Sequence, residues 1–434
     1  METQELLRYL VDKKEIIRNL TVFPRDISLE LTKNFITSIV GPRRSGKTYF
    51  LYDLINKLKL SDDSFIFMDF DDAELASANF KDIIKAINVH QEHYGKESEY
   101  IFLDEVQNVE NWHKAVRSLF ETKKYFIFLS GSSSKLLAKE IATTLRGRAI
   151  PYYIFPLSFR EYLNFKKFEI KKFYSTSEEN KVKNYLREYL KYGGFPNIVI
   201  EKKIADKFFN EYLDLVVFKD IVERHKIKNV FVIKFLIKTI VSSFAKEFSV
   251  HKVFQSLKSQ NIKVSKKTLY EYLTYLEDAL FLFPLKKFSY SVRESELSIP
   301  KVFINDVGLV NSIVSDFPRN IGRIMENVVF LELKRLQNIK PINLYFLKTQ
   351  NGEIDFVLSE GQKIKQLIQV CYDIHDIDVK KRELQPLVKG SKELKCKDLL
   401  VITYDYEAEE KFEGRKIKFL PLWRWLIEVS YRGK

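Results

Sequence analysis

Residues 41–48 read Gly41-Pro42-Arg43-Arg44-Ser45-Gly46-Lys47-Thr48 and fit the pattern G-x-x-x-x-G-K-S/T. The apolar, β-branched run Ile36–Val40 comes directly before them, and the apolar-rich run Tyr49–Leu54 follows. A strand, a glycine-rich turn and a helix in this order form the context in which such a loop wraps a phosphate chain. Because the pattern arises by chance in only about 1–2% of chains of this length, we interpret it as an ATP site.

Each residue type in this loop has a chemical reason. Gly41 and Gly46 let the backbone come close to phosphate oxygens with its N–H groups turned inward. Lys47 supplies a charge to the β- and γ-phosphates, and Thr48 offers a hydroxyl to Mg²⁺. The alternative is a glycine-rich turn with an exposed lysine. We expect the nucleotide to be bound by Gly41, Pro42, Arg43, Arg44, Ser45, Gly46, Lys47, Thr48 and Tyr49.

A second motif is the apolar run Tyr100-Ile101-Phe102-Leu103, which is followed by the two acids Asp104 and Glu105. Asp104, at the end of a buried strand, can hold Mg²⁺, and Glu105 can act as general base toward the attacking water. An acid directly after the metal-binding one favours hydrolysis of ATP over transfer to a small acceptor. The alternative is a strand that ends in two solvated acids.

Two further positions are candidates for contact with the γ-phosphate. The run 125–129 ends in five residues from Ser130 to Ser134, among which we favour Ser132 and, second, Ser130. A serine-rich cap of the following helix is the alternative. Arg146 and Arg148 flank a glycine, and we favour Arg148 as an arginine presented to the nucleotide of a neighbouring subunit. A surface arginine pair is the alternative, and a homo-oligomer is expected only from the first interpretation.

Short apolar runs between residues 35 and 155 indicate the fold around these motifs. They are β-branched and aromatic without polar alternation, as strands buried on both faces should be. Helical stretches separate them, which predicts right-handed crossovers and a parallel α/β sheet. The runs cover residues 35–40, 65–70, 100–103, 125–129 and 150–155.

The whole chain, at 434 residues, is too long for one core and predicts two to four domains. Hydrophobic residues make up 45% and charged residues 30%, and no run of about 18 apolar residues occurs, so a soluble protein without a membrane span is expected. The N-terminus lacks an apolar signal region. Cys371 and Cys396 have neither disulfide nor zinc spacing, which predicts a reduced, cytoplasmic protein.

Several motifs in order resemble those of one family. They are the loop with its double arginine, Leu103-Asp104-Glu105, Ser130-Gly131-Ser132-Ser133, Gly147-Arg148, Pro156-Leu157-Ser158-Phe159 and Gly193-Gly194-Phe195-Pro196. Together they resemble prokaryotic, mainly archaeal, AAA-type P-loop ATPases with a C-terminal domain similar to restriction endonucleases. The resemblance covers essentially the whole chain. It implies an ATPase core at 1–155, a helical lid at 156–229, a winged helix at 230–292 and a restriction-endonuclease-like α/β domain at 293–434, with ATP and Mg²⁺ as cofactors.

The charge of the chain is uneven. Lys and Arg total 72 against 58 Asp and Glu, and residues 221–290 alone hold 13 basic and 5 acidic residues, whereas 61–80 hold six acids and no basic residue. Helical segments at 230–247, 249–259 and 265–280, with a possible wing at 281–290, predict a helix-turn-helix. Lysines at the start of its third helix and on the wing suit DNA phosphates; a protein-contact module with a solvated lysine face is the alternative. These lysines are Lys263, Lys266, Lys267, Lys286 and Lys287.

The C-terminal part, from about Pro300, reads as a separate α/β domain. Glu326 and Asp355 match the acids of the nuclease-like family, but Gln369 and Cys371 stand where an acid and a lysine are expected. Glu353 offers a further acid on the same strand face as Asp355. We therefore expect a degenerate site without nuclease activity. The alternative interpretation of Glu326 and Asp355 is that they are structural acids that pair with nearby lysine or arginine.

Three functions remain open at this point. The first is Mg²⁺-dependent ATP hydrolysis that drives a conformational change on or near DNA. The second is an ATP-dependent switch that acts on a protein partner, and the third is an ATP-gated nuclease. Salt-sensitive stimulation of ATP turnover by DNA separates the first from the second. Metal-dependent cleavage that is lost in Asp355→Ala would support the third.

Overall fold

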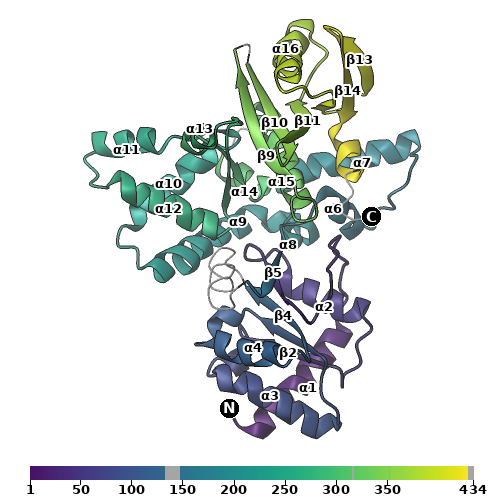
Figure 1. Ribbon diagram of the computed structural model, residues 1–434, viewed down its shortest axis with the longest axis vertical. Helices are drawn as coiled ribbons and strands as arrows, with labels where there is room; N and C mark the ends of the chain where they lie inside the picture. Colours follow the sequence, from purple (N-terminus) through teal and green to yellow (C-terminus); the bar gives the residue numbers. More distant parts are fainter. Residues whose placement is uncertain (132–146, 315–316, 351, 429–434) are drawn as a thin grey trace. The chain divides into compact units, whose positions relative to one another are not determined.

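The chain forms two compact units in a computed structural model that describes residues 1–131, 147–314, 317–350 and 352–428 (Figure 1). One unit comprises Met1–Phe155 together with Asp278–Leu280. The other comprises Pro156–Glu277 together with Phe281–Lys434. Among the described residues, no helix has both the length and the apolar character needed to cross a membrane.

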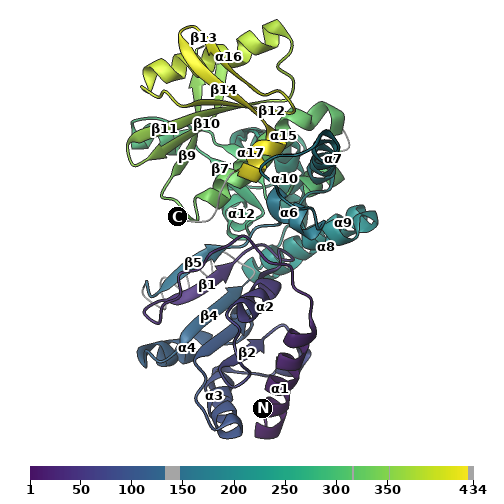
Figure 2. The same ribbon diagram turned by 90° about the vertical axis from the view of Figure 1, so that its right-hand side faces the viewer.

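The first unit is built on a five-stranded parallel sheet with the order β2-β3-β4-β1-β5, whose neighbouring strands Figure 2 shows side by side. Its residues are buried throughout β1 and β2, as the unbroken apolar runs predicted. The parallel α/β sheet is confirmed. The strands are β1 (Ile36–Val40), β2 (Phe65–Asp69), β3 (Tyr100–Asp104), β4 (Phe126–Gly131) and β5 (Ala149–Tyr153), and the helices are α1 (Thr3–Asn19), α2 (Lys47–Lys57), α3 (Phe80–Tyr94) and α4 (Trp112–Glu121).

The second unit begins with helices and a glycine pair that the sequence motif contains. Gly193 has φ +77, and a Cβ there would come 1.8 Å from Asp306 Oδ1. Gly194 donates its N–H to Asp306 Oδ2 at 2.7 Å. Glycine is therefore required for the close approach of this turn to a buried carboxylate. The helices are α6 (Phe159–Phe165), α7 (Thr176–Tyr192), α8 (Pro196–Ile200) and α9 (Ala205–Leu215), followed by a π-helical segment (Val216–Glu223).

Three helices and a small antiparallel sheet with the order β6-β8-β7 follow. The expected helix 230–247 ends at Ser242, because Lys246 and Glu247 form a strand. The strand expected to open the C-terminal domain at residue 300 instead pairs with β7 and β6. The elements are α10 (Val230–Ser242), β6 (Lys246–Glu247), α11 (Val250–Ser259), α12 (Lys266–Asp278), β7 (Leu282–Leu285), α13 (Val292–Leu297) and β8 (Lys301–Ile304).

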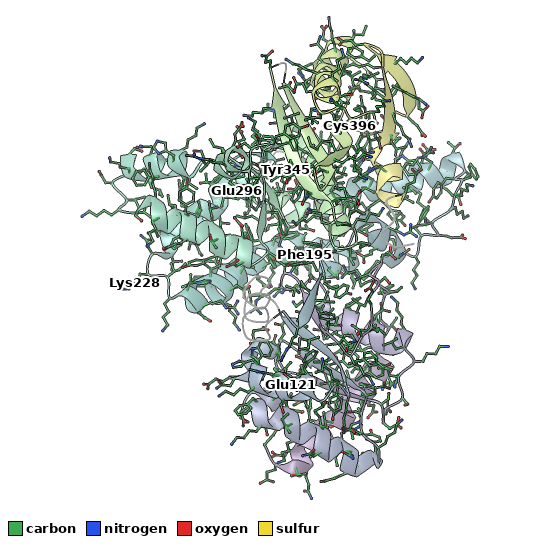
Figure 3. The ribbon with its side chains drawn as sticks, viewed as in Figure 1. Glu121, Phe195, Lys228, Glu296, Tyr345 and Cys396 are labelled. Carbon is green, nitrogen blue, oxygen red and sulfur yellow. The ribbon has the colours of Figure 1, made fainter. Side chains whose placement is uncertain are left out.

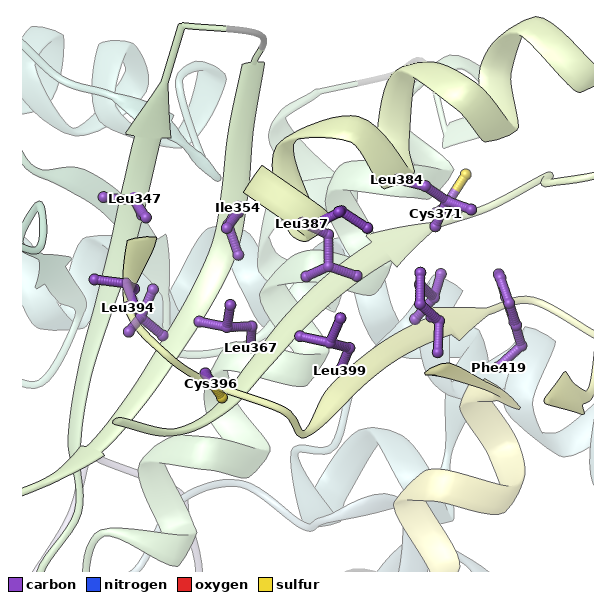
Figure 4. Packing of buried hydrophobic residues seen from close by; sticks show 14 of the residues in the cluster. Leu347, Ile354, Leu367, Cys371, Leu384, Leu387, Leu394, Cys396, Leu399 and Phe419 are labelled. Carbon is purple, nitrogen blue, oxygen red and sulfur yellow. The ribbon is translucent and has the colours of Figure 1, made fainter. Parts of the chain in front are cut away.

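The rest of the second unit is a six-stranded mixed sheet with the order β13-β14-β12-β11-β10-β9. One face packs against α16, where Ile354 and Leu367 meet Leu387 in a buried apolar cluster (Figure 4). On α15, Phe330 stacks on Phe303 of β8. The elements are α14 (Val307–Ile313), α15 (Phe317–Leu336), β9 (Asn343–Thr349), β10 (Gly352–Glu360), β11 (Lys363–Cys371), α16 (Ile377–Glu393), β12 (Leu399–Thr403), β13 (Ala408–Phe412), β14 (Arg415–Pro421) and α17 (Leu422–Glu428).

Candidate functional site

The loop predicted to bind ATP joins the carboxyl end of β1 to the start of α2. Gly46, directly before α2, has φ +93, and Arg44 has φ +60, so the loop turns through left-handed conformations. Gly41 lies against the chain after β5, since a Cβ there would come 2.2 Å from Ile154 O. The backbone N–H groups at the start of α2 are therefore held at the sheet edge where a phosphate chain would lie.

Two side chains at the start of α2 reach the acids at the end of β3. Lys47 is only 5% exposed, and its Nζ lies 3.2 Å from Glu105 Oε1 and 3.4 Å from Pro42 O. Thr48 hydrogen-bonds the carboxylate of Asp104. The structure thus brings together the loop and the acid pair that the sequence predicted separately.

Strand β4 lies between β1 and β3, and its last polar residue bridges the two acids. Ser130 is fully buried; its hydroxyl donates to Asp104 Oδ1 and accepts the N–H of Glu105 at 3.1 Å. Ser130 was the second choice from the sequence. Ser132, the first choice, lies outside the described residues.

The pKa values of Asp104 and Glu105 are shifted in opposite directions. Burial raises the pKa of Asp104 to about 7, and the charges of Glu105 and Asp69 add to this, while hydrogen bonds from Ser130 and Thr48 oppose it. Burial also raises the pKa of Glu105, but the Lys47 ammonium and its other partners outweigh burial and lower it overall. Glu105 is therefore ionised at neutral pH, whereas Asp104 titrates near it.

A buried cluster that sequence reasoning missed lies next to Asp104. Asp69 ends β2 and stands opposite Asp104 in the register of β2 and β3. The ammonium of Lys13, on α1, lies 3.0 Å from Asp69 Oδ2 and 2.7 Å from Asp72 Oδ2, and Tyr9 donates to the same Asp72 oxygen at 2.9 Å. Helix α1 therefore supplies the cation that the acid-rich segment 61–80 itself lacks.

Arg25 is a second residue that sequence reasoning missed. It is 6% exposed, and its guanidinium donates to Ser45 O at 2.9 Å and to Phe155 O at 2.7 Å. Its backbone N–H donates to Asp53 Oδ2 at 3.2 Å. Arg25 thus ties the phosphate loop to the chain after β5. No pattern around a single arginine points to this role.

The candidate arginine finger, Arg148, lies far from the loop of its own chain. It precedes β5, and its carbonyl accepts the N–H of Ile36 at the amino end of β1, whereas the loop follows the carboxyl end. The five residues of β1 separate the two edges by roughly 16 Å. Arg148 pairs with Glu121, labelled in Figure 3, and this pair lies at the edge of the sheet opposite the loop. Arg146 lies outside the described residues.

The predicted DNA-binding lysines fall into two groups. Lys263, Lys266 and Lys267 are exposed at the start of α12. Lys286 and Lys287 instead pair with acids of α13, Glu296 (labelled in Figure 3) and Glu294. The predicted wing is also not free, because residues 286–288 form backbone hydrogen bonds with Phe346 of β9. Both lysines are thus already paired with acids of this chain, and their contact with DNA phosphates stays a prediction.

A cavity of about 750 Å³ lies beside the first lysine group. The described residues that line it are apolar, polar or basic, and none of them is acidic. An anionic ligand with an apolar part has the chemistry that fits such a lining. The lining consists of Asn229, Val232, Phe254, Lys258, Asn261, Ile262, Lys263, Val264, Ser265, Thr268 and Tyr272.

The acids of the predicted nuclease-like site converge, but on a lysine. Glu326 of α15 and Asp355 of β10 both contact the ammonium of Lys301, a residue of β8. Burial raises the pKa of both carboxyls, against the opposing effect of Lys301. Gln369 accepts the N–H of Asp355 at 3.3 Å, and Cys371 is buried against α16. The strand that carries Lys301 was assigned to this domain, but the lysine itself was not singled out.

Three family models match consecutive parts of the chain. Residues 33–163 match one described as "AAA domain". Residues 183–320 and 321–425 match two described as "Domain of unknown function", DUF8612 and DUF4143. The first match and the parallel sheet with its phosphate loop show a P-loop domain of the AAA type, to which a separate C-terminal domain with a mixed sheet is added.

Two curated proteins match nearly the whole chain. Uncharacterized protein MJ1544 of Methanocaldococcus jannaschii is 41% identical over 426 residues, which cover 96% of this chain and 94% of that protein. An uncharacterized protein of Haemophilus influenzae is 26% identical over 394 residues, 90% of this chain and 94% of that protein. Among solved structures, AMPPCP-bound DnaA from Aquifex aeolicus is 15% identical, with 62% of this chain and 87% of that chain covered. Its TM-score of 0.24 is too low to support any inference.

Proposed function

The chain belongs to the same family as MJ1544 of Methanocaldococcus jannaschii, and on that premise we propose that it is a Mg²⁺-dependent ATPase of the AAA type. The observation that carries this proposal is the meeting of four side chains at one edge of the sheet. Lys47 contacts Glu105, and Thr48 contacts Asp104. A phosphate loop, a metal-binding hydroxyl and two acids placed together are the components that hydrolysis of a bound triphosphate requires.

The residues present fit a nucleotide with its metal ion. Asp104 Oδ2 is buried and has no hydrogen-bond partner within the described chain, which leaves a carboxyl oxygen for a cation. Thr48 and Asp104 would hold Mg²⁺, which when bound neutralises charge on the β- and γ-phosphates. Lys47 and the loop N–H groups would bind the phosphates themselves.

The ion pair between Lys47 and Glu105 gives binding a chemical consequence. When the ammonium turns to the phosphates, Glu105 loses its ion pair with Lys47. Its carboxylate is then available to accept a proton from water that attacks the γ-phosphate. Ser130 and Gln107 keep the acid in place, since Ser130 accepts its N–H and Gln107 donates to its Oε2 at 2.5 Å. Nucleotide binding would thus free the base that hydrolysis needs.

Two variants test this function separately for binding and chemistry. Lys47→Ala removes the phosphate-binding charge, so binding of a fluorescent ATP analogue should be abolished. Glu105→Gln keeps the size of the side chain but removes the base, so it should bind ATP and hardly turn it over. Glu110→Gln, an exposed acid at the start of α4, is the matched control. Wild-type turnover by Glu105→Gln would refute the assignment of the base.

We further propose that the ATPase acts on or near DNA through α10 to α12 and their small sheet, arranged as a winged helix. The supporting observation is the exposed group Lys263, Lys266 and Lys267 beside a cavity rim without acids. Phosphate contacts by lysine give salt-sensitive affinity without sequence preference. The test is the ATPase rate with and without single-stranded, duplex and branched DNA at two salt concentrations. A rate that no DNA changes would favour a switch that acts on a protein partner.

A further inference from the structure

A buried ammonium lies at the centre of three carboxylates in the second unit. Lys301 of β8 is 3% exposed, and its Nζ lies 2.7 Å from Glu326 Oε1 and 3.3 Å from Asp355 Oδ1. Glu353, also on β10, makes the third ion pair. The three acids come from α15 and β10, so side chains from three elements converge on one atom.

Three converging carboxylates are the donor set that hard divalent cations prefer. Glu326 and Asp355 are 8% and 7% exposed, so neither is an ordinary surface acid. Asp355 is also fixed in direction, because its Oδ2 accepts the N–H of Val370 at 2.9 Å. Yet within the described part of the chain, no group of three or more His, Cys, Asp or Glu side chains is placed to hold a metal ion. The point of convergence belongs to the lysine.

We propose that Lys301 is a built-in cation at a converted divalent-metal site. Its ammonium takes the position that a metal ion would take between Glu326, Glu353 and Asp355. The three acids then stabilise the fold through their ion pairs with Lys301. Metal-dependent nuclease chemistry does not fit this site while the lysine is present. The proposal is independent of ATP binding and hydrolysis, because all its residues lie in the second unit.

The position of Lys301 gives this cation a structural task. β8 is the central strand of the three-stranded sheet, while Asp355 and Glu353 belong to the six-stranded sheet. One charge therefore joins the two sheets of this unit. A buried carboxylate that loses its partner is strongly unfavourable. Removal of the ammonium should destabilise the unit and leave a vacant position into which a divalent ion can enter, past the partly exposed Glu353.

The experiment measures Mn²⁺ binding by the full-length chain without nucleotide. Every protein carries Asp104→Asn, so that the candidate ATP site lacks its acidic metal ligand and the proteins differ only in the second unit. In Lys301→Ala we expect Mn²⁺ to bind with a dissociation constant of about 0.1–1 mM, as at loosely built Ca²⁺ sites, and at least about tenfold more weakly with Lys301 present. The thermal midpoint of Lys301→Ala should fall without metal and rise again with Mn²⁺.

Three controls make the result specific. Lys348→Ala removes an exposed lysine of β9 that pairs with Glu247, and it should leave Mn²⁺ binding as weak as in the parent. Adding Glu353→Gln to Lys301→Ala should weaken Mn²⁺ binding. If Lys301→Ala does not fold, Lys301→Gln with Glu326→Gln removes the ammonium and one carboxylate together, and it should still bind Mn²⁺ more tightly than the parent.

Two results would overturn the proposal. One is tight Mn²⁺ binding by the parent protein with Lys301 intact, which would mean that lysine and metal share the site. The other is the failure of both lysine variants to bind Mn²⁺ better than the parent.

Discussion

Replacement of Ser130 by alanine offers a sharp test of the candidate ATP site, because one hydroxyl serves both acids. It donates to Asp104 Oδ1 and accepts the N–H of Glu105. A hydrogen bond to a charged group contributes about 1.5–3 kcal/mol, and about 1.4 kcal/mol corresponds to a factor of ten. We therefore expect Ser130→Ala to lower kcat by about 10- to 100-fold. Nucleotide affinity should change little, since Ser130 does not belong to the phosphate loop.

The pH dependence of the rate should change in a defined direction. Asp104, whose pKa is about 7 in the protein, must lose its proton to hold a cation, and the hydrogen bond from Ser130 favours that loss. Without the hydroxyl, the pKa of Asp104 rises further. As the solution is acidified, the rate of the Ser130→Ala variant should therefore begin to fall at a higher pH than the wild-type rate. The loss of about 1.4 kcal/mol of differential stabilisation moves this acid limb upward by about one pH unit.

The assay is the initial rate of phosphate release against pH at ATP and Mg²⁺ concentrations well below saturation, where the rate reports the pKa values of the unliganded protein. Ser38→Ala is the matched control, because Ser38 is a buried serine of the neighbouring strand β1 whose hydroxyl makes no hydrogen bond within the described chain. Its acid limb should coincide with that of wild type. An unchanged profile for Ser130→Ala, or a shift to lower pH, would refute the role of Ser130 in orienting Asp104.

Three further outcomes are expected. Arg148→Ala should bind ATP but not hydrolyse it. If Arg148 serves a neighbouring subunit, mixing this variant with Lys47→Ala should restore part of the activity. Light scattering that shows a monomer with ATP bound would contradict this role. Lys263→Glu with Lys267→Glu should weaken DNA binding and flatten its salt dependence, as fluorescence anisotropy would show. Lys286→Glu should weaken it less, because Lys286 lies 2.5 Å from Glu296, whereas Lys267 lies 3.9 Å from Glu271. Gly193→Ala should destabilise the second unit by about 1–3 kcal/mol, because a strained backbone angle would be combined with a collision with Asp306; an unchanged midpoint in denaturant would count against this.

Much of the first unit was predictable from the sequence, because its signals are local. The apolar runs gave the strands, and the loop motif placed Lys47 and Thr48 at the sheet edge. The strand order was not predictable, since it depends on how crossovers place distant segments. That order decides which strand meets Asp104: β4 lies beside β3, so Ser130 at the end of β4 reaches both acids. Arg25 and Lys13 act through contacts across the fold and leave no local pattern.

In the second unit the same reasoning was less successful. The helices at 249–259 and 265–280 were predicted, but the strand at 301–304, which was assigned to the C-terminal domain, pairs with β6 and β7 instead, because pairing is a long-range property. Lys286 and Lys287 looked like free wing lysines, because the acids that pair with them lie on α13, a helix that was not foreseen. A charge pattern along the chain gives the sum of charges, whereas burial and pairing decide which charges can meet a ligand.

The two acid clusters of this chain show why pairing decides function. At the candidate ATP site, Asp104 keeps one buried oxygen that has no hydrogen-bond partner among the described residues, and Glu105 is paired with Lys47, whose charge a phosphate can draw away. At the second cluster, the ammonium of Lys301 comes from a central strand and is enclosed by all three acids. Lys47 can move to the phosphates of a bound nucleotide, and Glu105 can then react. Lys301 has no such second anion in the proposal and stays between its three carboxylates. On the two proposals made above, similar residue types serve chemistry in one unit and the fold in the other.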